Sequence, residues 1–140
     1  MIKYETTLKA RTYECDMYGH VNNASFLNYC EAARIDFLNY LGFSLKSLIN
    51  KGWLLPIVKI EINYKLPVFA DEELTVSVIW KSRRQTSAVF EQEIIKNSTG
   101  QLAARAEITW VSTDLKNSPI PIPEEMLECI SQKFGELPEL

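Results

Sequence analysis

The stretch Tyr13–Gly42, YECDMYGHVNNASFLNYCEAARIDFLNYLG, decides how the rest of the chain is arranged. Within it, residues 24–41 carry apolar side chains at intervals of three and four, which is typical of a helix with one apolar face. Asn22 or Asn23 can cap the start of this helix, because an amide oxygen accepts a free N–H of the first turn. Gly42 suits the left-handed position that often follows a last turn. The stretch therefore predicts one long helix.

The remainder of the chain predicts a sheet. Residues 3–13 alternate between apolar and polar side chains, as a half-buried strand does. The same two-residue period returns in four later stretches, residues 59–68, 74–80, 86–96 and 101–112. The turn signal Asn97-Ser98-Thr99-Gly100 joins the last two as a hairpin. Two further stretches, residues 44–52 and 124–134, predict short helices.

The order of these elements indicates the fold class. An antiparallel sheet with one apolar face needs an apolar layer to cover that face. Only the helix of residues 24–41 is long and apolar enough to provide it. We therefore expect an α+β fold in which a five-stranded antiparallel sheet wraps around one central helix. A chain of 140 residues is expected to form this as a single domain over residues 1–140.

Composition excludes several classes of function. A net charge of −3 argues against a general nucleic-acid binder. No apolar run approaches the roughly 20 residues that span a bilayer, and the N-terminal residues lack the apolar segment of a signal peptide. The three cysteines, Cys15, Cys30 and Cys129, are odd in number and have no metal-ligand spacing. We expect reduced thiols in a cytoplasmic protein without a metal.

Polar residues that can take part in catalysis lie just before the helix, in the run Asp16-x-x-Gly19-His20-Val21-Asn22-Asn23. The first N–H groups of a helix are unpaired and lie at the positive end of its dipole, so they can stabilise a carbonyl oxygen that gains charge. A carboxylate folded back beside them can activate water or attack the carbonyl. This layout indicates a hydrolase that needs neither a serine nor a metal.

This run, followed by F-x-x-Y-x-E-x-x-R over residues 26–34, resembles the hot-dog-fold thioesterases. The resemblance extends to about Val111 and is strongest to the 4-hydroxybenzoyl-CoA thioesterase and acyl-CoA thioesterase branch, with the H-V-N-N residues also similar to plant acyl-ACP thioesterases. It implies hydrolysis of an acyl-CoA or acyl carrier protein thioester. It also implies no cofactor besides the coenzyme A of the substrate, and a homodimer or homotetramer with acyl sites between subunits.

The resemblance assigns roles residue by residue. Asp16 matches the catalytic carboxylate, and Asn23 matches the helix-start position whose backbone N–H polarises the thioester carbonyl. His20 and Asn22 match polar residues that position substrate or water. From the residues alone, a structural role for His20 is about as well supported as a direct one.

Basic residues near a strand turn bind the coenzyme A nucleotide in this family. Here Lys81, Arg83 and Arg84 are the candidates, with the last two matching a paired-arginine position. The enzyme that acts on 4-hydroxybenzoyl-CoA lacks the His-Val-Asn-Asn run, so a fatty acyl substrate is at least as well supported as an aromatic one.

Other functions remain open at this point. A hydratase or dehydratase of acyl thioesters would pair His20 with Glu31 of the helix. A non-catalytic module would bind acyl-CoA or acyl carrier protein without turnover. Another hot-dog lineage also places its catalytic carboxylate in the central helix, but Arg34 follows Glu31 by three residues, and we expect these two to form an ion pair.

Overall fold

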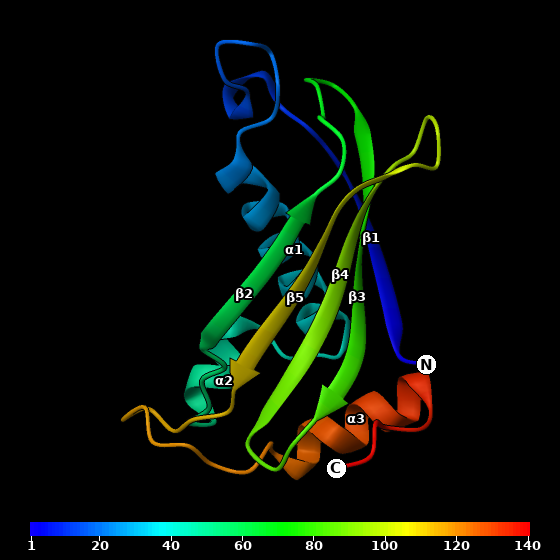
Figure 1. Ribbon diagram of the computed structural model, residues 1–140. Coiled ribbons are helices and arrows are strands. Elements are labelled where there is room, and N and C mark those ends of the chain that lie inside the picture. Colours follow the sequence, from blue (N-terminus) through cyan, green and yellow to red (C-terminus); the bar gives the residue numbers. More distant parts are fainter.

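One antiparallel sheet curves around a long helix in the computed structural model, which describes residues 1–140 (Figure 1). In chain order the elements are β1 Lys3–Lys9, the 3-10 turn η1 Thr12–Glu14, α1 Asn23–Tyr40, α2 Leu45–Asn50, β2 Ile57–Tyr64, β3 Glu73–Arg83, β4 Ser87–Lys96, β5 Leu102–Val111 and α3 Glu124–Phe134. The five strands lie in the order β1-β3-β4-β5-β2, with every neighbouring pair antiparallel. The predicted arrangement of sheet and helix is confirmed.

Helix α1 begins and ends where local signals predict. The side chain of Asn22, not Asn23, is the N-cap, and it accepts a hydrogen bond from Ala24 N–H at 2.9 Å. After Leu41 the chain turns at Gly42 with a φ of 92°, a left-handed angle that glycine adopts without strain. Both signals depend only on residues next to the helix end, so the sequence can place them.

The buried face of α1 packs against β1 and β3, and a fully buried glutamine fastens it to the sheet. Gln92 of β4 donates to the carbonyls of Cys30 and Ser77, at 3.0 and 3.2 Å. Its side-chain oxygen accepts from Arg34 Nη1 at 2.8 Å. Arg34 forms no ion pair with Glu31, so that prediction was wrong. The guanidinium turns inward to the glutamine instead of along the helix surface.

Two predicted strands are shorter than their alternation suggests. Strand β1 ends at Lys9 instead of continuing to residue 13, because Glu14 accepts the N–H of Arg11 and closes the turn η1. Strand β2 ends at Tyr64, before the bend that contains Pro67. Residues beyond both ends keep the alternating pattern without the ladder of hydrogen bonds that defines a strand.

Strand β2 lies at an edge of the sheet and pairs only with β5. Seven of its eight residues are exposed, including Val58 at 59% and Ile60 at 40%. Helix α1 makes its close backbone contacts with β1 and β3 and few with β2. The apolar side chains predicted to face one way on this strand are therefore left open in a single chain.

The C-terminal helix α3 matches the predicted residues 124–134 and closes one end of the sheet (Figure 1). It buries Met126, Leu127 and Ile130, and Phe134 lies with its ring centre 5.7 Å from that of Phe37 in α1. The hairpin between β4 and β5 also forms at the predicted turn. None of the helices is both long enough and apolar enough to cross a membrane.

Candidate active site

The turn before α1 fixes the carboxylate of Asp16 through backbone hydrogen bonds. Its Oδ1 atom accepts from the N–H groups of Tyr18 and His20, at 2.8 and 3.2 Å. The backbone closes the same turn, with Asp16 N–H donating to the His20 carbonyl at 2.7 Å and Gly19 N–H donating to the Asp16 carbonyl at 3.0 Å. Gly19 has a φ of 79°, which side chains resist. The second oxygen, Oδ2, receives no hydrogen bond from the protein and is available to a ligand.

The start of α1 offers an unused donor. The side-chain oxygen of Asn22 accepts a hydrogen bond from Ala24 N–H, whereas the backbone N–H of Asn23 donates to no atom of the protein. The carbonyl of Asn23 accepts a hydrogen bond from the Tyr64 hydroxyl at 3.2 Å. The ring of Tyr64 also stands edge-on to Phe26, with centres 5.2 Å apart. Strand β2 thereby holds the first peptide of the helix in place.

These groups face one open cavity of about 250 Å³, lined by Asp16, His20, Asn23 and Tyr64 among others. The His20 ring lies against Phe69 at 5.0 Å and forms no hydrogen bond of its own. Three of the four predicted catalytic residues thus share the cavity. Asn22 contributes the helix cap beside it.

A buried tyrosine braces this turn against the helix. Tyr29 of α1 is 4% exposed, and its hydroxyl donates to Glu14 Oε1 at 2.8 Å. The same carboxylate oxygen accepts from Arg11 N–H at 2.7 Å, and the Glu14 carbonyl accepts from Asn22 N–H at 2.8 Å. Burial, and then the bond to Glu14, raise the pKa of Tyr29, so it remains a neutral donor. Sequence reasoning missed Glu14 and Tyr64, since their partners lie 15 and 41 residues away.

The predicted coenzyme A residues lie at the other end of the sheet (Figure 1). Strand β3 starts beside the active-site turn and reaches Arg83 ten residues later, roughly 33 Å along the strand. Lys81 forms an ion pair with Glu107, and Arg83 Nε donates to the Pro138 carbonyl. The Arg84 side chain has no hydrogen-bond partner. A single chain therefore does not bring these three residues to Asp16.

The helix carboxylate is also separate from this cavity. Glu31 follows Asn23 by eight residues, about 12 Å along the helix axis, and lines a different cavity beside α2. His20 and Glu31 thus do not form the pair that a hydratase of the predicted kind requires.

Comparison with known proteins identifies the family. Residues 10–130 match the model of the thioesterase-like superfamily. The chain belongs to this superfamily. It is 34% identical to the long-chain acyl-CoA thioesterase FadM of Escherichia coli K12, over 91% of this chain and 97% of that protein. It is 30% identical to the acyl-CoA thioester hydrolase YbgC of E. coli O6:H1, over 81% and 85%. These matches confirm the predicted family and its thioester hydrolase class.

The fold comparison agrees with this assignment. The crystal structure of the DHNA-CoA thioesterase from Staphylococcus aureus superimposes with a TM-score of 0.85 at 25% identity, covering 95% of this chain and 91% of that one. The hot-dog fold expected from the sequence is confirmed.

Proposed function

We propose that this thioesterase-like protein hydrolyses acyl-CoA thioesters at the cavity that joins Asp16 to the start of α1. The unpaired N–H of Asn23 is the observation that carries the proposal. A thioester oxygen placed on it would accept a hydrogen bond at the positive end of the helix dipole, where charge develops in acyl transfer. Asp16 lines the same cavity, and its Oδ2, which accepts no hydrogen bond from the protein, can activate water or attack the carbonyl.

The remaining groups have supporting roles in this proposal. His20 flanks the cavity with its ring held by Phe69, so it can orient the substrate or the water. Asn22 holds the helix start by its cap. The chemistry uses side chains and one backbone N–H, and coenzyme A enters as part of the substrate without a separate cofactor or metal. Three cysteines without a disulfide fit a cytoplasmic location.

We infer that the protein acts as a homodimer formed through β2. The strand has an unpaired edge with exposed Ile57, Val58 and Ile60, and such edges are normally covered. When β2 pairs antiparallel with its copy, the two sheets run in opposite directions. The end of one sheet that carries Arg83 and Arg84 then lies level with the helix start of the other. This would allow the two arginines to approach the coenzyme A nucleotide although they are remote from Asp16 in their own chain.

Asp16→Asn tests the mechanism. The amide oxygen of asparagine can still accept the two backbone N–H groups that orient residue 16, so the turn should keep its shape. The variant loses the base or nucleophile, and we expect kcat for acyl-CoA hydrolysis to fall by about 10² or more, measured by thiol release. The matched control is Glu31→Gln, which removes a carboxylate of α1 that lines a different cavity and should retain kcat. Near wild-type turnover by Asp16→Asn, or an equal loss in the control, would contradict the mechanism.

A further inference from the structure

One wall of the catalytic cavity comes from the segment that connects β2 with β3. Pro67 of this segment lines the cavity, and the Phe69 ring lies against His20 with ring centres 5.0 Å apart. The backbone joins the segment to the active-site turn as well, since Val21 N–H donates to the Val68 carbonyl at 2.7 Å. Phe69 is 43% exposed, so core packing holds its ring only in part. Other contacts must fix it beside His20.

A lysine and a glutamate supply these contacts. Lys96 Nζ lies 3.1 Å from Glu72 Oε1 and donates to the Pro67 carbonyl at 3.2 Å. The same ammonium lies 5.7 Å from the centre of the Phe69 ring, within the distance of a cation–π contact. The other oxygen of the glutamate, Oε2, accepts a hydrogen bond from Phe69 N–H at 2.8 Å. One ion pair thus contacts both the side chain and the backbone of Phe69.

This ion pair is the most buried in the chain. The side chains of Lys96 and Glu72 are 13% and 22% exposed, whereas the cation of every other pair is at least 37% exposed. Exposed pairs contribute little, but a shielded pair is screened much less by salt. The lysine also has a fixed backbone, because its N–H closes the β4–β5 hairpin on the Gln101 carbonyl at 2.9 Å. Lys96 therefore ties the connecting segment to a rigid part of the sheet.

We propose that Lys96 and Glu72 are positioning residues for hydrolysis, which hold Pro67 and Phe69 so that His20 faces the catalytic cavity. The inference rests on the proposed function, in which His20 orients the substrate or the water. Neither positioning residue lines the cavity, so both act through the segment between them and not by contact with the thioester. Without the ammonium, the Pro67 carbonyl and the Glu72 carboxylate lose the group that joins them, and the Phe69 ring is free to turn away from His20.

Lys51→Met is the matched control for Lys96→Met. Lys51 forms an ion pair with Glu125 at 3.0 Å and lies 5.5 Å from the centre of the Trp53 ring, so it makes the same two kinds of contact. Lys51 follows α2, and none of these three residues lines the catalytic cavity. We expect Lys96→Met to lower kcat for acyl-CoA hydrolysis about tenfold and to change KM by less than about twofold, because the catalytic geometry changes and the substrate contacts do not. Lys51→Met should retain kcat.

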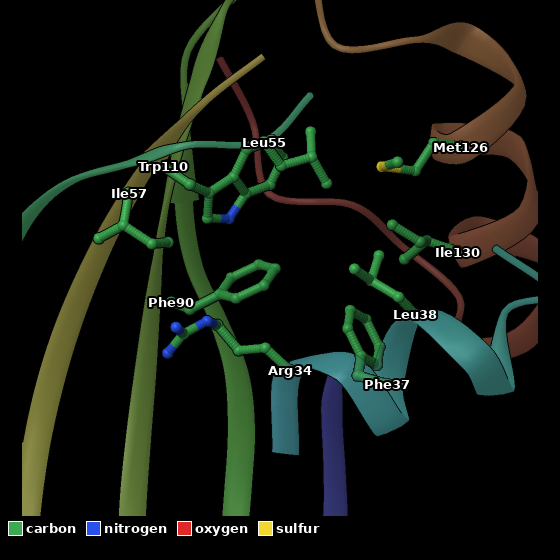
Figure 2. A pocket seen from close by; sticks show the side chains of 9 residues that line it. All are labelled: Arg34, Phe37, Leu38, Leu55, Ile57, Phe90, Trp110, Met126 and Ile130. Carbon is green, nitrogen blue, oxygen red and sulfur yellow. The ribbon is translucent and has the colours of Figure 1, made fainter. Parts of the chain in front are cut away.

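A second control separates positioning from a loss of stability. Ile130 is 1% exposed and lines an apolar cavity between α1, α3 and the strands β4 and β5, which contains no residue of the active-site turn (Figure 2). Ile130→Val removes one buried methyl group, so it should lower Tm without lowering kcat. Lys96→Arg keeps a cation with several N–H donors and should restore most of the wild-type kcat. Equal losses of kcat in Ile130→Val and Lys96→Met would overturn the proposal.

Glu72→Gln tests whether the two residues act as one unit, and it remains informative if Lys96→Met does not fold. The amide oxygen can still accept from Phe69 N–H, but the ion pair is lost, so kcat should fall several-fold. The double variant Lys96→Met/Glu72→Gln should lose no more kcat than the larger single loss, because both changes break the same contact. Losses that multiply in the double variant would contradict the proposal.

A spectroscopic readout separates this inference from the proposed function. His20 is the only histidine of the chain, so its two ring C–H proton signals are identified without further variants. An aromatic ring displaces the signals of protons near it, so Lys96→Met should move the His20 signals toward those of an unstructured histidine. Lys51→Met and Ile130→Val should leave them in place. If the wild type is active, an unchanged kcat or unmoved His20 signals in Lys96→Met refute the positioning role, whereas moved signals in a protein without turnover refute only the hydrolase.

Discussion

Tyr29→Phe tests whether the buried tyrosine holds the catalytic turn on the helix. The substitution removes one hydroxyl from a side chain that is 4% exposed and keeps the ring that packs in the core. It deletes the 2.8 Å hydrogen bond to Glu14 Oε1. A hydrogen bond to an ionised group contributes about 1.5–3 kcal/mol, so we expect the free energy of unfolding to fall by about 2 kcal/mol. For a domain of this length that corresponds to a Tm lower by about 7 °C.

The activity of Tyr29→Phe should fall as well, through a different route. The Glu14 side chain keeps its bond from Arg11 N–H but loses its bond to α1, and only the Glu14 carbonyl still joins this turn to Asn22, so the turn that carries Asp16 is held less firmly beside Asn23. We expect kcat to decrease several-fold while the protein remains folded at the assay temperature, because small displacements of a catalytic group are costly.

Tyr40→Phe is the matched control for this prediction. Tyr40 lies on the same helix, is 45% exposed and makes no hydroxyl hydrogen bond, so both Tm and kcat should stay near wild type. Calorimetry and thiol release measure the two quantities on the same preparations. A Tm of Tyr29→Phe within about 1 °C of the wild type would show that the hydrogen bond adds no net stability. An unchanged kcat with a lowered Tm would limit the tyrosine to a role in folding.

Two further predictions concern the core and the sheet edge. Burial raises the pKa of the Cys30 thiol from 9.0 to about 11, so the unfolded chain ionises first as pH rises. The free energy of unfolding, measured by urea unfolding, should therefore drop by about 2 kcal/mol between pH 9 and 11, and by less in Cys30→Ala; an equal drop in both proteins would contradict this. Val58→Lys places a charge on the open edge of β2 and should convert the proposed dimer to a 16.1 kDa monomer in light scattering, unlike Leu115→Lys on an exposed loop. A dimer that survives Val58→Lys would place the interface elsewhere.

Local patterns predicted the elements whose ends depend on neighbouring residues. Asn22 and Gly42 mark the two ends of α1 because a cap and a left-handed turn involve only nearby backbone groups. Alternation likewise identified all five strands. It could not tell that β2 lies at the edge next to β5, because a two-residue period assigns side chains to faces and not strands to positions.

The wrong ion pair shows where spacing misleads. Glu31 is one helical turn from Arg34, yet the guanidinium bonds to Gln92, which is 58 residues away. The sequence did contain a sign of this contact. Arg34 interrupts the apolar face of the helix, and Gln92 interrupts the apolar face of β4 between Phe90 and Ile94. When two apolar faces pack together, water is excluded from both. A polar residue on each face can then form a hydrogen bond with the other, which costs less free energy than leaving either of them unpaired.

The same distinction explains why the catalytic groups could be anticipated and the residues that brace them could not. Every hydrogen bond that orients the Asp16 carboxylate comes from a backbone N–H within four residues. The orientation of the carboxylate therefore depends only on the short run before α1. The hydrogen bonds that brace this run, from Tyr29 to Glu14 and from Tyr64 to Asn23, instead join residues that are 15 and 41 positions apart. The orientation is therefore local, whereas the bracing depends on how distant elements pack. Members of one fold can then keep a common hydrolytic step while their substrates diverge.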